Sequence, residues 1–141
     1  MAEERSVQRS FRLTRSTAEL LDLEAESAGS SRNALADRLL GEALRQEHHP
    51  LIRFVQGASG RRQALLAGTR LYVYQVAATC EAHRGSVDET AAYFDLPLTS
   101  IRAALDYAAD FDSEVAADRA AAERVAAAER RRFERHHPAQ A

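Results

Sequence analysis

The sequence contains one cysteine and no long apolar run, and these absences exclude several classes of protein. Cys80 has no second cysteine to pair with, so an internal disulfide is impossible. No apolar stretch is long enough to cross a bilayer, and the acidic N-terminus does not have the composition of a signal peptide. We therefore expect a cytoplasmic protein with no membrane partner.

Lysine is also absent, because all 19 basic residues are arginine, against 21 Asp and Glu residues. The abundance of arginine is therefore no argument for nucleic-acid binding, and only the positions of the arginines count as evidence. The length of 141 residues and the charged fraction of 28% allow one or two small domains.

The residue patterns of common enzyme sites are missing too. The turn Gly57-Ala58-Ser59-Gly60 lacks the lysine and the Ser or Thr that a P-loop requires. Cys80 and His83 lie three residues apart, but no second Cys/His pair at structural-zinc spacing follows them. No Ser-His-Asp or Cys-His arrangement is indicated either. We expect no catalytic residue, no metal and no cofactor.

A basic segment near the N-terminus is the most informative feature that is present. Between Arg5 and Arg15 there are four arginines and no carboxylate. The alternation of residue types predicts a strand with one apolar face that packs and one polar face that is free to contact a partner. The apolar face would carry Val7, Phe11 and Leu13, and the polar face would carry Gln8, Ser10 and Arg12.

A single strand leaves its backbone groups unpaired, so we expect it to pair with the same strand of a second subunit. A two-stranded ribbon fits the major groove of DNA, where Arg can bind guanine and Gln can bind adenine. This segment therefore predicts a homodimer that contacts operator DNA through Gln8, Ser10 and Arg12.

Two helices are predicted after the strand. Ser16 or Thr17 can cap the first helix, and Gly29 ends it. Ser31 can cap the second helix, which continues to His48, where histidines and a proline follow. The start of the second helix, with its free N–H groups, is a candidate site for a DNA phosphate.

The first fifty residues resemble a ribbon-helix-helix domain of the VapB-like antitoxins and small bacterial repressors. The resemblance covers SFRLT, the helix from Ser16 to Ala28, and GSSRNALADRLLGEAL. It implies an intertwined dimer in which Gln8, Ser10 and Arg12 contact bases. It also implies that Ser31, Arg32 and Asn33 contact the DNA backbone. The alternative is an ordinary structural strand and hairpin.

The second region begins after Pro50 and reads as a small hairpin followed by helices. Extended pieces are predicted near Leu51–Val55, at Leu65 and Leu66, and at Leu71–Val73. Helices are predicted over Tyr74–His83, from Ser86 onward, and from Thr99 to about Phe111. Arg61 and Arg62, beside the hairpin turn, are expected on a solvated edge, with a phosphate contact as the alternative.

The last two of these helices form a helix-turn-helix pattern, which is one possible DNA-binding element. The second of them, however, carries one arginine and three aspartates: Arg102, Asp106, Asp110 and Asp112. Its exposed face would be acidic and would repel phosphates. We favour a scaffold role.

The fold class expected is mainly α, with domains over 1–50, 51–112 and 113–141: a ribbon-helix-helix domain, a small helix-turn-helix-like domain with short strands, and a helical tail.

Residues 65–115 resemble a bacterial antitoxin domain of otherwise undefined function. The resemblance rests on LAGTRLYVYQVAAT, SVDETAAYFDLPLTSIRAALDYAADF and the following SEV. Proteins of that family are commonly encoded beside toxins with a PIN-type nuclease fold. The resemblance therefore implies a PIN-type toxin as partner, and it implies no catalytic residue in this chain.

The tail from Ser113 to Arg135 is rich in Ala, Arg and Glu, which favours a helix with little to bury. One interpretation is a solvated helix that keeps the dimer soluble. The other is a toxin-binding segment, since Arg can pair with the carboxylates of a metal-binding nuclease centre and an aromatic ring can anchor the contact. The candidate toxin-binding residues are Arg130, Arg131, Arg132, Phe133 and Arg135.

These patterns together predict a type II antitoxin that binds operator DNA as a dimer, represses its own transcription and neutralises a PIN-type ribonuclease. The alternative is a stand-alone ribbon-helix-helix transcriptional regulator without a toxin. A short toxin gene beside this one would favour the antitoxin.

Overall fold

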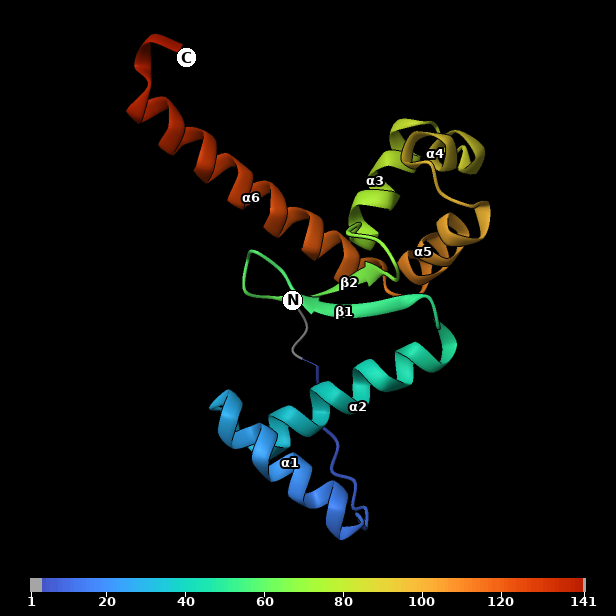
Figure 1. The fold of residues 1–141 in the computed structure, drawn as a ribbon, viewed down its shortest axis with the longest axis vertical. Helices are drawn as coiled ribbons and strands as arrows, with labels where there is room; N and C mark the ends of the chain where they lie inside the picture. The colour runs from blue at the N-terminus through green and yellow to red at the C-terminus, as the bar shows by residue number, and fades with distance from the viewer. Residues whose placement is uncertain (1–3, 141) are drawn as a thin grey trace. The chain divides into compact units, whose positions relative to one another are not determined.

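The computed structural model describes residues 4–140, which are mainly helical and include one two-stranded sheet (Figure 1). The chain divides into two compact units. Unit 1 comprises the described residues up to 43, and unit 2 comprises those from 44 onward. The division into three domains expected from the sequence stays a prediction.

Unit 1 contains helix α1 (Arg15–Ala28) and most of helix α2 (Arg32–His48). Thr14 caps α1, because its hydroxyl oxygen accepts a hydrogen bond from the Thr17 N–H at 3.3 Å. The predicted caps Ser16 and Thr17 are therefore wrong, since both lie within the first turn. Gly29 ends α1 as predicted, in the left-handed conformation (φ +62°) that glycine adopts without strain.

The predicted N-terminal strand is wrong, and so is the strand-then-two-helices layout built on it. Residues 4–14 contain no strand, and α1 is the first regular element. Within the described residues, the two strands are β1 (Ile52–Gln56) and β2 (Arg62–Leu66), and they pair with each other. The N-terminal segment has no strand to pair with, and side-chain alternation does not make a strand without partners for the backbone N–H and C=O groups. The mainly helical class fits the structure.

Unit 2 begins with the end of α2, and the antiparallel hairpin β1–β2 follows, in which Ile52 lies opposite Leu66. Four helices and a short 3-10 helix follow, namely α3 (Val73–Ala82), α4 (Val87–Phe94), α5 (Leu98–Asp110), α6 (Asp112–His136) and η1 (Pro138–Gln140). The extended piece expected over Leu71–Val73 is reduced to one bridge between Leu65 and Tyr72, because Val73 already belongs to α3.

Local sequence signals set the ends of α4. The Ser86 hydroxyl accepts a hydrogen bond from the Glu89 N–H at 3.1 Å, which confirms the predicted cap. Asp95 ends the helix in the left-handed region, at φ +53°. The predicted Thr99 cap of α5 is wrong, because the helix starts at Leu98 after Pro97. Proline fixes φ and suits a position at a helix start.

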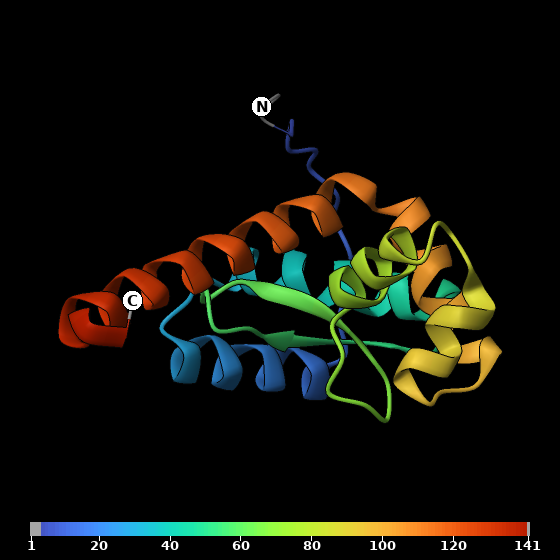
Figure 2. The same cartoon turned by 90° about the horizontal axis from the view of Figure 1, so that it is seen from above.

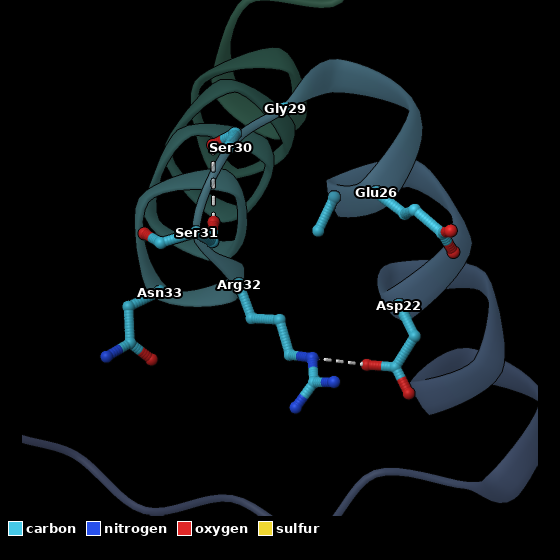
Figure 3. A pocket seen from close by; sticks show the side chains of 8 residues that line it. Asp22, Glu26, Gly29, Ser30, Ser31, Arg32 and Asn33 are labelled. Carbon is cyan, nitrogen blue, oxygen red and sulfur yellow. Dashed lines mark hydrogen bonds and ion pairs between the residues drawn. The ribbon is translucent and has the colours of Figure 1, made fainter.

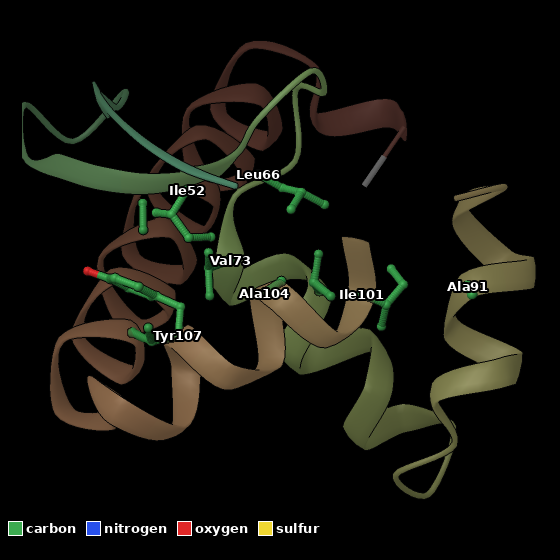
Figure 4. Packing of buried hydrophobic residues seen from close by; sticks show 10 residues of the cluster. Ile52, Leu66, Val73, Ala91, Ile101, Ala104 and Tyr107 are labelled. Carbon is green, nitrogen blue, oxygen red and sulfur yellow. The ribbon is translucent and has the colours of Figure 1, made fainter. Parts of the chain in front are cut away.

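The core of unit 2 lies between the hairpin and α3 and α5 (Figure 4). Its fully buried side chains include Ile52, Leu66, Val73, Ile101 and Tyr107. These side chains come from strands and helices that are far apart in sequence, so the core fixes the arrangement of the whole unit.

Helix α6 joins this core only along its first half. Val115 and Ala121 are buried, and α6 packs on α3 and α5. From residue 128 to 139 every side chain is exposed. Figures 1 and 2 show this C-terminal part of α6 extending away from the hairpin and the other helices of unit 2. The expectation that the tail buries little therefore holds only for its second half.

Candidate nucleic-acid interface

A shallow hollow lies in unit 1 at the turn between α1 and α2 (Figure 3). Its lining residues are Asp22, Ala25, Glu26, Gly29, Ser30, Ser31, Arg32 and Asn33. Ser31 caps α2 as predicted, since its hydroxyl accepts a hydrogen bond from the Ala34 N–H at 3.1 Å. The structure thus brings together the three predicted contacts to the DNA backbone, Ser31, Arg32 and Asn33.

Arg32 already has a carboxylate partner in this hollow. Its Nε lies 2.8 Å from Oδ1 of Asp22, and both side chains are more than half exposed. Exposed ion pairs of this kind contribute only about 0–1 kcal/mol, so a phosphate can compete for the guanidinium. Sequence reasoning missed Asp22 and Glu26, although their spacing of four residues places both on one face of α1.

The three candidate base contacts, Gln8, Ser10 and Arg12, lie in the irregular segment before α1. All three are exposed. Within residues 4–140, their side chains take part in no hydrogen bond or ion pair. They are therefore accessible to a partner, and no hydrogen bond or ion pair with another described residue fixes their geometry.

Unit 1 leaves most of its large apolar side chains exposed. Among its described residues, Ala25 and Leu35 are the buried ones. The exposed apolar set of unit 1 consists of Val7, Phe11, Leu13, Leu20, Leu23, Leu39 and Leu40. Phe11 is 71% exposed and Leu20 is 67% exposed. Unit 1 therefore buries little of its own apolar surface within the described residues.

Unit 2 contains a hydrogen-bonded network between the end of α2, α5 and the start of α6. Arg45 Nη1 donates to Glu114 Oε1 at 2.6 Å and to the Tyr107 hydroxyl at 3.2 Å. The Tyr107 hydroxyl donates to Glu114 Oε2 at 2.6 Å. Burial, together with the bond to Glu114, raises the pKa of the Tyr107 hydroxyl well above its usual range. The tyrosine stays protonated, so it remains a donor and holds these elements together.

A second ion pair joins the hairpin turn to α6. Arg61 Nη2 lies 3.2 Å from Oδ1 of Asp118, a residue that is only 2% exposed. Burial raises the pKa of the Asp118 carboxyl, and the positive charge of Arg61 opposes that rise. Arg61 itself is exposed, as expected for a residue at the edge of the hairpin, and the structure adds a buried carboxylate as its partner. Asp118 lies three residues from both Val115 and Ala121, and that spacing is the sequence signal for its burial.

The candidate toxin-binding residues lie together on the exposed end of α6. Within residues 4–140, Arg130, Arg131, Arg132 and Arg135 make no hydrogen bond or ion pair through their side chains. The Phe133 ring is exposed and packs against His137, with ring centroids 4.6 Å apart. This end of α6 offers several positive charges and one aromatic ring to a partner.

Comparison with known proteins gives no relative for this chain. No family model matches it, and no similar protein is found among the curated proteins or the solved structures. Over the part of the chain that the structure describes, no helix has the length and apolar character needed to cross a membrane.

Proposed function

We propose that the protein is a dimeric, DNA-binding antitoxin that represses its own transcription and neutralises a PIN-type nuclease toxin. The observation that carries the proposal is in unit 1, where a large exposed apolar set accompanies a segment of arginines without carboxylates. The exposed apolar side chains need another subunit to cover them. The arginines suit binding to a polyanion such as DNA.

Dimerisation is supported by the small core of unit 1. Complete burial of a Leu, Val or Phe side chain contributes about 1.5–3 kcal/mol, and the exposed apolar set of unit 1 has seven such side chains. Two buried residues do not offset the entropy of ordering two helices. A second copy that covers the exposed set would supply the missing burial.

DNA binding is supported by charge and by the helix start at α2. The side chains of Arg9 and Arg12 are exposed and unpaired within the described residues, so they are accessible to phosphates or base edges. The N–H groups at the start of α2, beside Asn33, favour an anion. Arg32 would exchange Asp22 for a phosphate. We expect the affinity for DNA to fall as the salt concentration rises.

Toxin binding is supported by the exposed end of α6. A helix with no packing partner is marginally stable in water, and a bound partner would bury and stabilise it. Arginine can form two parallel hydrogen bonds to a carboxylate, which is the ligand type that holds divalent metals in nuclease centres. Phe133 would supply the apolar anchor.

The test is co-expression of the tagged full-length protein with the product of the adjacent gene, followed by size-exclusion chromatography with light scattering. Co-elution supports the antitoxin. A chain that elutes without the toxin but still binds operator DNA would instead be the stand-alone regulator.

A truncation after Ala127 removes the exposed end of α6 and leaves the buried Val115, Asp118 and Ala121 in place. This truncation should abolish toxin binding and leave DNA binding intact. Retained toxin binding would contradict the role assigned to the tail.

A further inference from the structure

The exposed end of α6 carries a cluster of arginines, with Glu129 and Glu134 among them. Within residues 4–140, its four clustered arginines, Arg130, Arg131, Arg132 and Arg135, form no ion pair. Phe133 is exposed beside them. Arginine and aromatic side chains are enriched in protein interfaces, so this helix end has the composition of a docking element.

Helix α4, in the same unit, presents the complementary chemistry. Asp88, Glu89 and Tyr93 are all exposed, and Tyr93 is 66% exposed. Its ring is supported by Phe94 and His83, at centroid distances of 5.0 and 5.6 Å. Asp88 has no side-chain partner among the described residues, and Glu89 contacts only His83, at 3.3 Å.

Arginine can bind this surface in two ways at once. A guanidinium that lies over the Tyr93 ring gains a cation–π interaction. Glu89 lies one helical turn before Tyr93, so its carboxylate can accept charge-assisted hydrogen bonds from the same guanidinium, and a second arginine can pair with Asp88. We define the α4 surface as Asp88, Glu89 and Tyr93.

The two surfaces do not meet within one chain. Figures 1 and 2 both place α4 and the C-terminal end of α6 at opposite ends of unit 2. Helix α6 has 25 residues, which makes it about 37 Å long at 1.5 Å per residue. Its first half packs on α3 and α5, so the exposed end cannot fold back onto α4. A contact between the two surfaces therefore requires two copies.

We propose that the exposed end of α6 of one copy docks on the α4 surface of another copy. The two surfaces differ, so the contact is head-to-tail, and copies add in series wherever the arrangement does not close into a ring. An open series leaves one of each surface unoccupied at its ends. The contact is small and charged, so it is weak and sensitive to salt. The inference does not depend on DNA binding, because both surfaces lie in unit 2. A toxin bound to the exposed end of α6 would compete with this contact, so the docking concerns the protein without its toxin.

Sedimentation velocity of the full-length protein tests this docking. The wild type should form species larger than a dimer that grow with protein concentration at about 0.1 M salt. They should disappear at about 1 M salt, where the Debye length falls from ~10 to ~3 Å. Two variants should each lose these species: the tail variant Arg131→Glu/Arg135→Glu and the surface variant Asp88→Arg/Glu89→Arg.

Mixing the two variants gives the decisive result. In the mixture, the glutamates on the tail of the first variant can pair with the arginines on the α4 surface of the second. The wild-type tail of the second variant can likewise pair with the wild-type α4 surface of the first. The mixture should therefore recover the larger species that neither variant forms alone, which also shows that both variants are folded. Tyr93→Ala should weaken association without a change of charge. Arg70→Glu, at an exposed position without a described partner, should leave association unchanged.

Three results would overturn the docking. One is a wild-type mass that does not depend on salt or concentration. Another is association that persists in both variants, which would place the contact elsewhere. The third is a mixture that stays unassociated. None of these results affects the proposed function, because DNA binding and toxin co-elution are measured separately. If the tail variant loses the toxin while the wild type does not self-associate, the toxin is the occupant of this helix end.

Discussion

The ion pair between Arg61 and Asp118 gives a prediction with a characteristic pH dependence. Arg61→Ala leaves the Asp118 carboxylate buried without its cation. Removing one partner of a fully buried pair costs about 3–5 kcal/mol, and an exposed pair contributes about 0–1 kcal/mol. The Arg61 side chain is 44% exposed, so the pair lies between these limits. We expect a loss of about 1–2 kcal/mol in the free energy of unfolding at neutral pH.

The loss should depend on the ionisation of Asp118. Burial raises the folded-state pKa of this carboxyl above its unfolded value, so the folded protein binds the proton more tightly than the unfolded chain does. As the pH falls, this carboxyl binds its proton in the folded protein before it does so in the unfolded chain, and Asp118 then carries no charge for Arg61 to stabilise. The cost of Arg61→Ala should therefore be smaller at acidic pH than at neutral pH.

Urea unfolding of both proteins at several pH values measures this cost. Arg70→Ala is the matched control, because Arg70 is exposed and has no described partner, and its cost should stay near zero throughout. An equal loss at pH 4 and pH 7 would refute the electrostatic argument and would show that Arg61 acts through packing alone. No loss at pH 7 would show that the pair does not stabilise the fold.

Two further predictions concern the buried network and the DNA contact. Tyr107→Phe removes the hydroxyl that bonds to Glu114, and since hydrogen bonds to charged groups contribute ~1.5–3 kcal/mol, the midpoint of urea unfolding should fall accordingly. An unchanged midpoint would contradict a stabilising role for this network. Arg12→Ala should weaken operator binding by about 1–3 kcal/mol and relax the preference at one base position, as measured by fluorescence anisotropy on a set of operator variants. An equal loss on all DNA sequences would assign Arg12 to a phosphate.

The sequence predicts those features of the fold that depend on neighbouring residues. Gly29 ends α1, and Ser31 and Ser86 cap the helices that follow them, because the atoms of a cap lie within four residues of each other. The extended piece predicted over Leu51–Val55 is close to the observed strand Ile52–Gln56, because its apolar residues are neighbours in the sequence. Cap positions still shift by a residue or two, as at Thr14.

Features that depend on distant residues could not be predicted in this way. The N-terminal alternation of apolar residues resembles a strand, but a strand needs a second strand, and the described chain has none for it. The partner of Arg61 is Asp118, which lies 57 residues further along the chain. The burial of Val115 and Ala121 likewise depends on packing between α6 and α3, and the composition of the tail does not indicate it.

Light scattering on the full-length wild type and on Leu20→Asp/Leu23→Asp, with operator binding measured separately on the same two proteins, tests whether unit 1 acts as a dimeric DNA-binding unit. The masses should be measured at about 1 M salt, which suppresses the head-to-tail contact, and operator binding at about 0.1 M salt, where the affinity for DNA is higher. The wild type should have twice the chain mass of 15.6 kDa. The variant places charge within the exposed apolar set of unit 1, so it should have the mass of one chain and lose specific DNA binding. A wild type of 15.6 kDa, or a variant that stays dimeric and binds the operator, would contradict the proposal.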